Sequence, residues 1–65
     1  MKIIINGKIK KLEVKNLREL LLKLKFNPER TLVSVNGNVV EKKAYPKTTL
    51  SDGDKVDVFS FVGGG

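Results

Sequence analysis

The chain has 65 residues, enough for one domain with a small hydrophobic core, and 40% of them are hydrophobic. It has no cysteine, which excludes disulfides, thiolate nucleophiles and cysteine zinc sites, and no histidine, the commonest general base. Thirteen basic and seven acidic residues give a net charge of +6. The sequence shows neither an apolar run of membrane-spanning length nor a signal-peptide pattern, so we expect a cytoplasmic protein.

The excess of basic over acidic residues suggests the hypothesis that the protein binds nucleic acid. The lysines are spread along the chain, however, and the densest group has no aromatic residues between its members for stacking on bases. We therefore expect a solvated lysine surface, and a basic RNA-binding module stays open as an alternative. That densest group is Lys8, Lys10, Lys11 and Lys15.

The first elements form a predicted hairpin. Residues 2–5 are rich in β-branched side chains, which favours a strand, and Asn6-Gly7 is the strongest short hairpin signal because a type I′ turn needs positive φ at both positions. Residues 8–14 are the predicted returning strand. A two-residue turn pairs Ile4 with Ile9 on one face. Either a bulge near Lys10 shifts the alternation or this face is partly apolar, and we favour the second interpretation.

A short helix follows, and a capping pattern predicts its start. Asn16 and Glu19 have the spacing of a capping box, and the helix ends before Pro28, which disfavours helical geometry in the residue preceding it. Leucines recur at i, i+3, i+4 and i+7, which predicts one apolar stripe facing the core. They are Leu17, Leu20, Leu21 and Leu24, while Leu22 points away.

The second half of the chain predicts another hairpin and a final strand. Residues 32–36 and 39–41 flank the second Asn-Gly turn, residues 42–50 are an irregular connection, and residues 55–62 are the last strand. The turn at 51–54 contains two aspartates, but it has too few ligands and the wrong spacing for calcium, so we assign it to turn chemistry.

This element order predicts an α+β fold of the ubiquitin-like β-grasp type. A mixed sheet of about five strands has one main helix on one face, and the first and last strands lie parallel at its centre. Its other face is left uncovered. Residues 1–62 form the predicted domain, and residues 63–65 a flexible glycine tail that cannot contribute to a core.

The parity of the strands predicts an apolar patch on the uncovered face. Ile3, Ile5, Val56 and Val58 are expected to face the helix. A contiguous group with two phenylalanines is expected to bind a partner, because the patch leads directly into the glycines. The predicted partner-binding residues are Ile4, Ile9, Phe59, Phe61 and Val62. The opposing interpretation is that sheet twist and the connection at 42–50 cover part of this face.

The chain resembles the ThiS family of small sulfur carriers in thiamine thiazole biosynthesis, over its whole length. The resemblance rests on residues 3–7, the capped leucine helix, Val35 to Val40, Leu50 to Val56 and the ending Phe61-Val62-Gly63-Gly64-Gly65. The Asp-Gly-Asp segment and the terminal glycines also occur in MoaD-like carriers. The strongly basic balance is a departure from the family pattern.

The resemblance implies a protein that is a substrate and not an enzyme. A ThiF-like adenylating enzyme would consume ATP to activate the Gly65 carboxylate, and a cysteine persulfide on another protein would supply sulfur. A thiocarboxylate on Gly65 would then donate sulfur to a ThiG-like thiazole synthase. Gly63 and Gly64 would let the tail enter a narrow active site. No bound cofactor, metal, nucleic acid or membrane is implied; a molybdopterin carrier and a ubiquitin-like modifier stay open as alternatives.

Overall fold

Asn6-Gly7 forms the first hairpin as predicted, with φ angles of 49° and 83°. In the computed structural model, which describes residues 1–60, it joins β1 (Lys2–Ile5) to β2 (Lys8–Lys11) and pairs Ile4 with Ile9. The prediction that the second strand continues to residue 14 is wrong. The strand ends at Lys11, although the backbones of Leu12 and Met1 still bond to each other, and Val14 is buried in the core.

The helix α1 (Leu17–Lys23) begins with the predicted cap. The Asn16 Oδ1 atom accepts a hydrogen bond from the Glu19 backbone N–H at 2.8 Å. Glu19 reaches back to the N–H of Lys15 at 3.1 Å, one residue earlier than in a standard capping box. The stripe faces the sheet, with Leu17, Leu20 and Leu21 buried and Leu22 exposed.

The helix ends through its own C-terminal motif, four residues before Asn27. Lys25 has a φ of 66°, and its N–H donates to the carbonyl of Leu22 at 3.0 Å. The N–H of Phe26 donates to the carbonyl of Leu21 at 2.8 Å, which completes a Schellman motif. Pro28 is therefore not the residue that ends the helix; it is the first residue of the 3₁₀ turn η1 (Pro28–Arg30).

The second hairpin joins β3 (Thr31–Val35) to β4 (Asn38–Val40) through Asn36-Gly37. Its φ angles of 52° and 85° again match a type I′ turn. Both strands begin one residue earlier than predicted. Residue 33 faces the core and residue 32 faces outward, as the alternation predicts.

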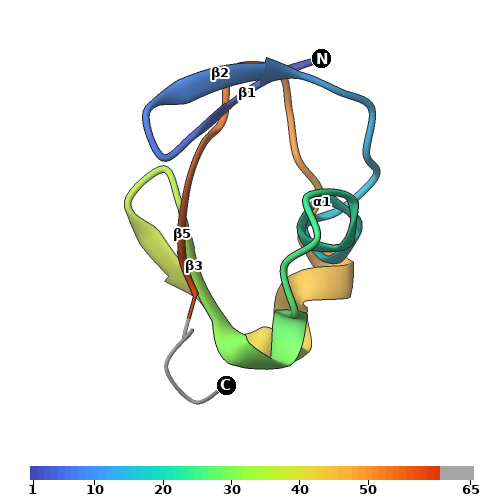
Figure 1. Cartoon of the computed structure of the whole chain (residues 1–65), viewed down its shortest axis with the longest axis vertical. Helices are drawn as coiled ribbons and strands as arrows, with labels where there is room; N and C mark the ends of the chain where they lie inside the picture. Colours follow the sequence, from blue (N-terminus) through green and yellow to red (C-terminus); the bar gives the residue numbers. More distant parts are fainter. Residues whose placement is uncertain (61–65) are drawn as a thin grey trace.

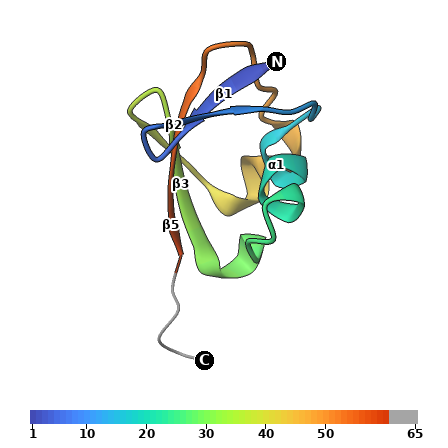
Figure 2. The same ribbon diagram turned by 45° about the horizontal axis from the view of Figure 1, so that its top comes forward.

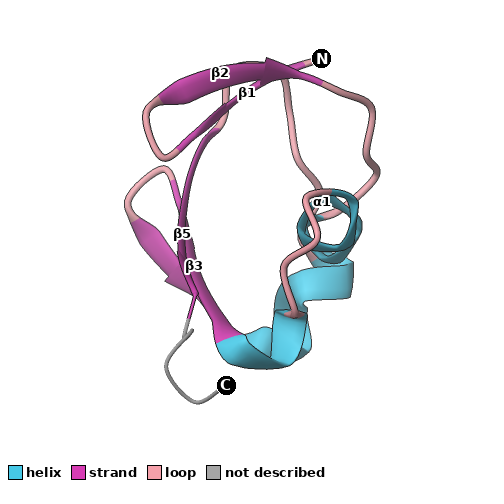
Figure 3. Cartoon of the chain, in the orientation of Figure 1, coloured by secondary structure: helices cyan, strands magenta, loops and turns pink. Residues whose placement is uncertain are grey.

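The predicted irregular connection contains the 3₁₀ helix η2 (Lys42–Lys47), which packs against α1. Its Tyr45 side chain is buried, and the phenol donates a hydrogen bond to the carbonyl of Thr31 at 2.7 Å. This segment therefore closes the core on the helix side of the sheet, and it does not cover the opposite face as the alternative interpretation required. Figures 1 and 3 show it beside α1.

The final strand β5 (Lys55–Ser60) completes a five-stranded sheet of order β2-β1-β5-β3-β4. It runs parallel to β1 and antiparallel to β3, so the predicted mixed sheet with a parallel central pair is confirmed. The sheet curves around the core with α1 on its inner side (Figures 1 and 2). The core consists of Ile3, Ile5, Val14, Leu17, Leu20, Leu21, Val33, Tyr45, Leu50, Val56 and Val58.

Candidate functional site: the end of β5 and the open face

The centre of the predicted site, residues Phe61, Val62 and Gly63–Gly65, lies outside the described residues, as does the predicted domain boundary at residue 62. The structure describes the strand that leads to this segment. β5 lies at the centre of the sheet and has a neighbour on each side. The candidate site is therefore built from β5, its two neighbours and the uncovered face of the sheet.

On the β3 side, β5 is paired up to Ser60, which lies opposite Thr31. On the β1 side, strand pairing reaches only Val56, opposite Ile5. At Val58, the side chain of Asn6 takes the place of a backbone partner. Its Oδ1 atom accepts a hydrogen bond from the Val58 N–H at 2.8 Å, and its Nδ2 atom donates one to the Val58 carbonyl at 3.3 Å. The turn side chain thus extends the β1 side of the sheet by one further pairing.

The second Asn-Gly turn fixes the other end of β5. The Asn36 Oδ1 atom accepts from the Lys55 N–H at 3.0 Å, and its Nδ2 atom donates to Asp54 Oδ1 at 3.1 Å. Sequence reasoning recognised both asparagines only as turn formers. Their contacts with β5 were missed because they link residues far apart in the sequence, for which the local pattern gives no signal.

The uncovered face carries the expected apolar side chains. Ile9 is 67% exposed and Phe59 is 63% exposed, whereas Ile4 is half-buried between its neighbours. Two exposed residues were missed as members of this surface: Leu32, 43% exposed, lies opposite Phe59, and Val39, 79% exposed, lies on the neighbouring edge strand. The alternation of Leu32 with the buried Val33 was the signal that could have identified the first.

The strand register divides this face into two areas, so the prediction of one contiguous patch is corrected. Ile4 lies beside Lys55, whereas Phe59 is four residues further along β5, roughly 13 Å away. Asp57 lies between them on the same face. We call the first group the basic area and the second the apolar area. The basic area comprises Lys2, Ile4, Ile9, Lys11 and Lys55, and the apolar area comprises Leu32, Val39 and Phe59.

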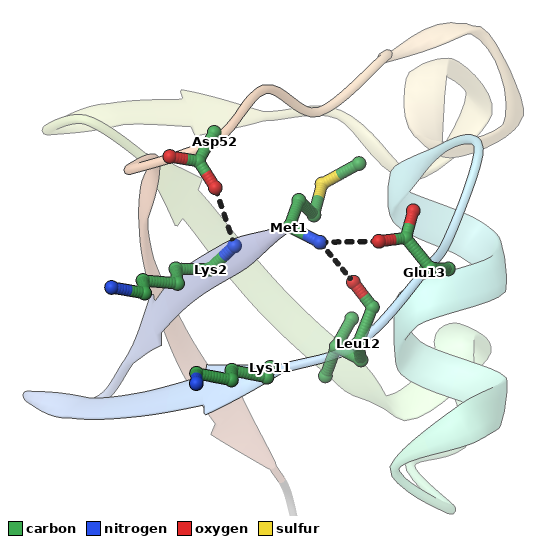
Figure 4. Close-up of a pocket in the computed structure, with 6 residues that line it drawn as sticks. All are labelled: Met1, Lys2, Lys11, Leu12, Glu13 and Asp52. Carbon is green, nitrogen blue, oxygen red and sulfur yellow. Dashed lines mark hydrogen bonds and ion pairs between the residues drawn. The ribbon is translucent and has the colours of Figure 1, made fainter.

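A shallow pocket of about 480 Å³ adjoins the basic area at the end of the sheet (Figure 4). Its polar groups bond to one another: the Met1 ammonium contacts the Glu13 carboxylate and the Leu12 carbonyl, and Asp52 Oδ1 accepts from the Lys2 N–H at 2.6 Å. The side chains of Lys2 and Lys11 extend away from these bonded groups in Figure 4.

Residues 1–60 contain no group of three or more acidic side chains placed to hold a metal ion. None of the helices in this range combines the length and apolar character needed to cross a membrane. Burial raises the pKa of Tyr45, but this phenol belongs to the core and not to the open face.

A mixed five-stranded sheet with a parallel central pair, one helix on one face and an open opposite face defines a ubiquitin-like β-grasp protein. The chain belongs to the ThiS family, whose model, described as "ThiS family", matches residues 3–65.

Solved structures agree with this assignment. The crystal structure of the thiamine biosynthesis protein ThiS from Geobacter metallireducens is 39% identical, covers both chains completely and superposes with a TM-score of 0.84. The solution structure described as a thiamine biosynthesis protein of the same organism gives a TM-score of 0.82, also at 39% identity, and the match covers 88% of that chain.

Curated relatives include two proteins named thiazole synthase. The chain is 33% identical to the one from Paramagnetospirillum magneticum and 38% identical to the one from Magnetococcus marinus, over 100% of its own length. It spans only 20% of the length of each of these proteins. An uncharacterized protein, ycf40 of Porphyra purpurea, is 36% identical over 77% of this chain and 70% of its own.

Proposed function

We propose that this chain is a sulfur carrier of thiamine biosynthesis that holds sulfur as a thiocarboxylate on Gly65. The observation that carries the proposal is the family match, which runs through the terminal glycines to residue 65. Family membership and the 39% identity to a thiamine biosynthesis protein of the same fold support this role. The alternative molybdopterin carrier has no comparable support among these relatives.

The proposed chemistry begins with a carboxylate, which is a poor electrophile. A ThiF-like partner enzyme joins the Gly65 carboxylate to the AMP portion of ATP and releases pyrophosphate. The terminal sulfur of a cysteine persulfide on a donor protein attacks the carbonyl carbon, and AMP leaves. A second thiol then cleaves the resulting S–S bond, which leaves the thiocarboxylate on Gly65 and a disulfide on the thiol side. This chain has no cysteine, so every thiol in the sequence of steps belongs to a partner.

Thiazole synthase is the proposed sulfur acceptor. Two proteins with this name contain a stretch similar to the whole of this chain, which supports an association between the two activities. In the proposal, Gly63 and Gly64 pass through a narrow channel where a Cβ atom would collide. The partner-binding role predicted for Ile4, Ile9, Phe59, Phe61 and Val62 is retained. Leu32 extends the surface beside Phe59, and Val39, opposite Ser34, adds an exposed apolar side chain on the edge strand.

The test is intact-mass spectrometry after incubation with ATP, the adenylating enzyme and a persulfide donor. We expect the wild-type chain to gain the mass difference of one oxygen replaced by sulfur. Deletion of Gly64 and Gly65 should abolish this gain, because the reacting carboxylate no longer reaches the activating site.

A thermal melt of the truncated chain is the control. The deletion should leave the melting temperature nearly unchanged, because the core is formed within residues 1–60. Sulfur incorporation into the truncated chain would contradict the proposal.

A further inference from the structure

Three lysines surround an apolar pair on the open face. Lys2 and Lys11 lie opposite each other across β1 and β2, next to the Ile4–Ile9 pair, and Lys55 lies beside Ile4 on β5. Within residues 1–60, the ion pairs are those of Met1 with Glu13 and of Lys43 with Glu41. None of the three lysines of the basic area takes part in them.

The fold gains nothing from this arrangement of charge. Like charges directly opposite each other on neighbouring strands are destabilising, and Lys2 and Lys11 form such a pair. Asp57 is the single acidic residue among the strand residues beside this area on the open face, and it has no ion pair in this part of the chain. Outside the strands, Asp52 and Glu13 line the adjoining pocket, where Asp52 accepts from the Lys2 backbone N–H and Glu13 pairs with the Met1 ammonium. Within residues 1–60, the side chains of the three lysines themselves form no ion pair, and they lie around a partly exposed apolar centre.

We propose that the basic area is the docking site for an acidic surface of the adenylating enzyme, with Ile4 and Ile9 as its apolar centre. This inference rests on the proposed function, because it assigns a chemistry to the partner that activates Gly65. Charge complementarity carries it: an acidic surface neutralises the three lysines, and burial of an exposed isoleucine supplies contact area.

The position of the area suits this role. Lys55 and Ser60 are separated by five residues of β5, about 17 Å. A standard interface of about 800 Å² per partner is roughly 30 Å across, so one enzyme can cover the basic area and still reach the end of β5. Docking here would hold β5 in place while its continuation enters the active site.

The experiment compares two charge reversals in their affinity for the purified adenylating enzyme, measured by titration at low and at physiological salt. Lys11→Glu changes the basic area, and Lys47→Glu makes the same change in net charge on η2, on the helix side of the sheet. A second pair adds Lys55→Glu to the first variant and Lys43→Glu to the control.

We expect the double variant in the basic area to bind at least about tenfold more weakly at low salt, with a reduced salt dependence, and the control double to change less than about threefold. Lys11→Glu should keep or raise the melting temperature, because it replaces a like-charge pair by an attractive pair with Lys2. Weaker binding without loss of stability is the signature of a docking residue.

An equal loss of affinity in the two double variants would overturn the inference, because it would show a general effect of net charge. Unchanged affinity in the basic-area double would also overturn it. So would tight binding of a single-stranded RNA oligonucleotide at physiological salt that only this double removes, since the area would then serve nucleic acid. Sulfur loading of the wild type, measured separately, decides the proposed function independently of these results.

Discussion

Residues of the two faces alternate along the same strands, yet we expect substitutions on the two faces to have very different effects. On β5, Val56 and Val58 are buried beneath α1, while the neighbouring Phe59 is largely exposed. The covered face is specified by packing, because each side chain fills a defined space. The open face is left free by the fold, so its apolar and basic side chains need another explanation, which the proposed partners provide.

The largest expected effect is a charge on the covered face. Val58→Asp places an unpaired carboxylate in the core and should cost more than about 4 kcal/mol. A domain of this size has a total stability of roughly 3–5 kcal/mol, so the variant should be unfolded in a circular-dichroism melt. A cooperative melt near the wild-type temperature would contradict the claim that the covered face is specified by packing.

A smaller loss is expected for Tyr45→Phe. The substitution leaves the Thr31 carbonyl without its partner and should cost about 1–2 kcal/mol in denaturant unfolding. Burial raises the pKa of Tyr45, so the neutral phenol stabilises the fold below a pH of about 10, and this contribution is lost as the pH rises further. The variant should therefore lose less stability than the wild type above that pH. Parallel stability curves would contradict this role of the phenol.

Substitution of the two turn asparagines that contact β5 should have local effects on this strand. Asn6→Gly keeps the positive φ of the turn but removes both hydrogen bonds to Val58, at a cost of about 1 kcal/mol. Amide hydrogen exchange should become faster at Val58. The matched variant Asn36→Gly should accelerate exchange at Lys55 instead. Identical exchange patterns in the two variants would show that neither side chain holds its own part of β5.

The smallest effect on folding is expected on the open face. Phe59→Asp should cost under about 1 kcal/mol of stability, as surface changes usually do. The same change should weaken binding to the adenylating enzyme and to the synthase by at least about 2 kcal/mol, because it removes an aromatic anchor. A thermal melt and a pull-down against each enzyme test both halves. Normal binding to both enzymes would exclude Phe59 from the docking surface.

Much of the covered face could be predicted from the sequence because its signals are local. Both Asn-Gly turns fix a hairpin register within a few residues, and Asn16 and the leucine stripe define the start and the buried side of α1. The order of elements then leaves a parallel pairing of the first and last strands, which the structure confirms.

The remaining features depend on contacts between distant residues. Tyr45 lies in a polar stretch without periodicity, and its burial depends on a carbonyl of β3 that only the folded chain brings near. The alternation of side chains predicts the face on which a strand residue lies. It does not predict the register, that is, how far along the sheet the residue lies relative to a strand that is distant in the sequence. For this reason, Ile4 and Phe59 were assigned correctly to one face but incorrectly to one patch.

Locating the sulfur on the chain is the most direct test of the carrier role. After loading with ATP, the adenylating enzyme and a persulfide donor, trypsin cleavage after Lys55 releases the peptide of residues 56–65. Tandem mass spectrometry should place one sulfur-for-oxygen replacement at the carboxyl group of Gly65, and only when ATP is present. An unmodified peptide under full loading conditions, or Gly65 linked through an isopeptide bond to a lysine, would contradict the sulfur-carrier account.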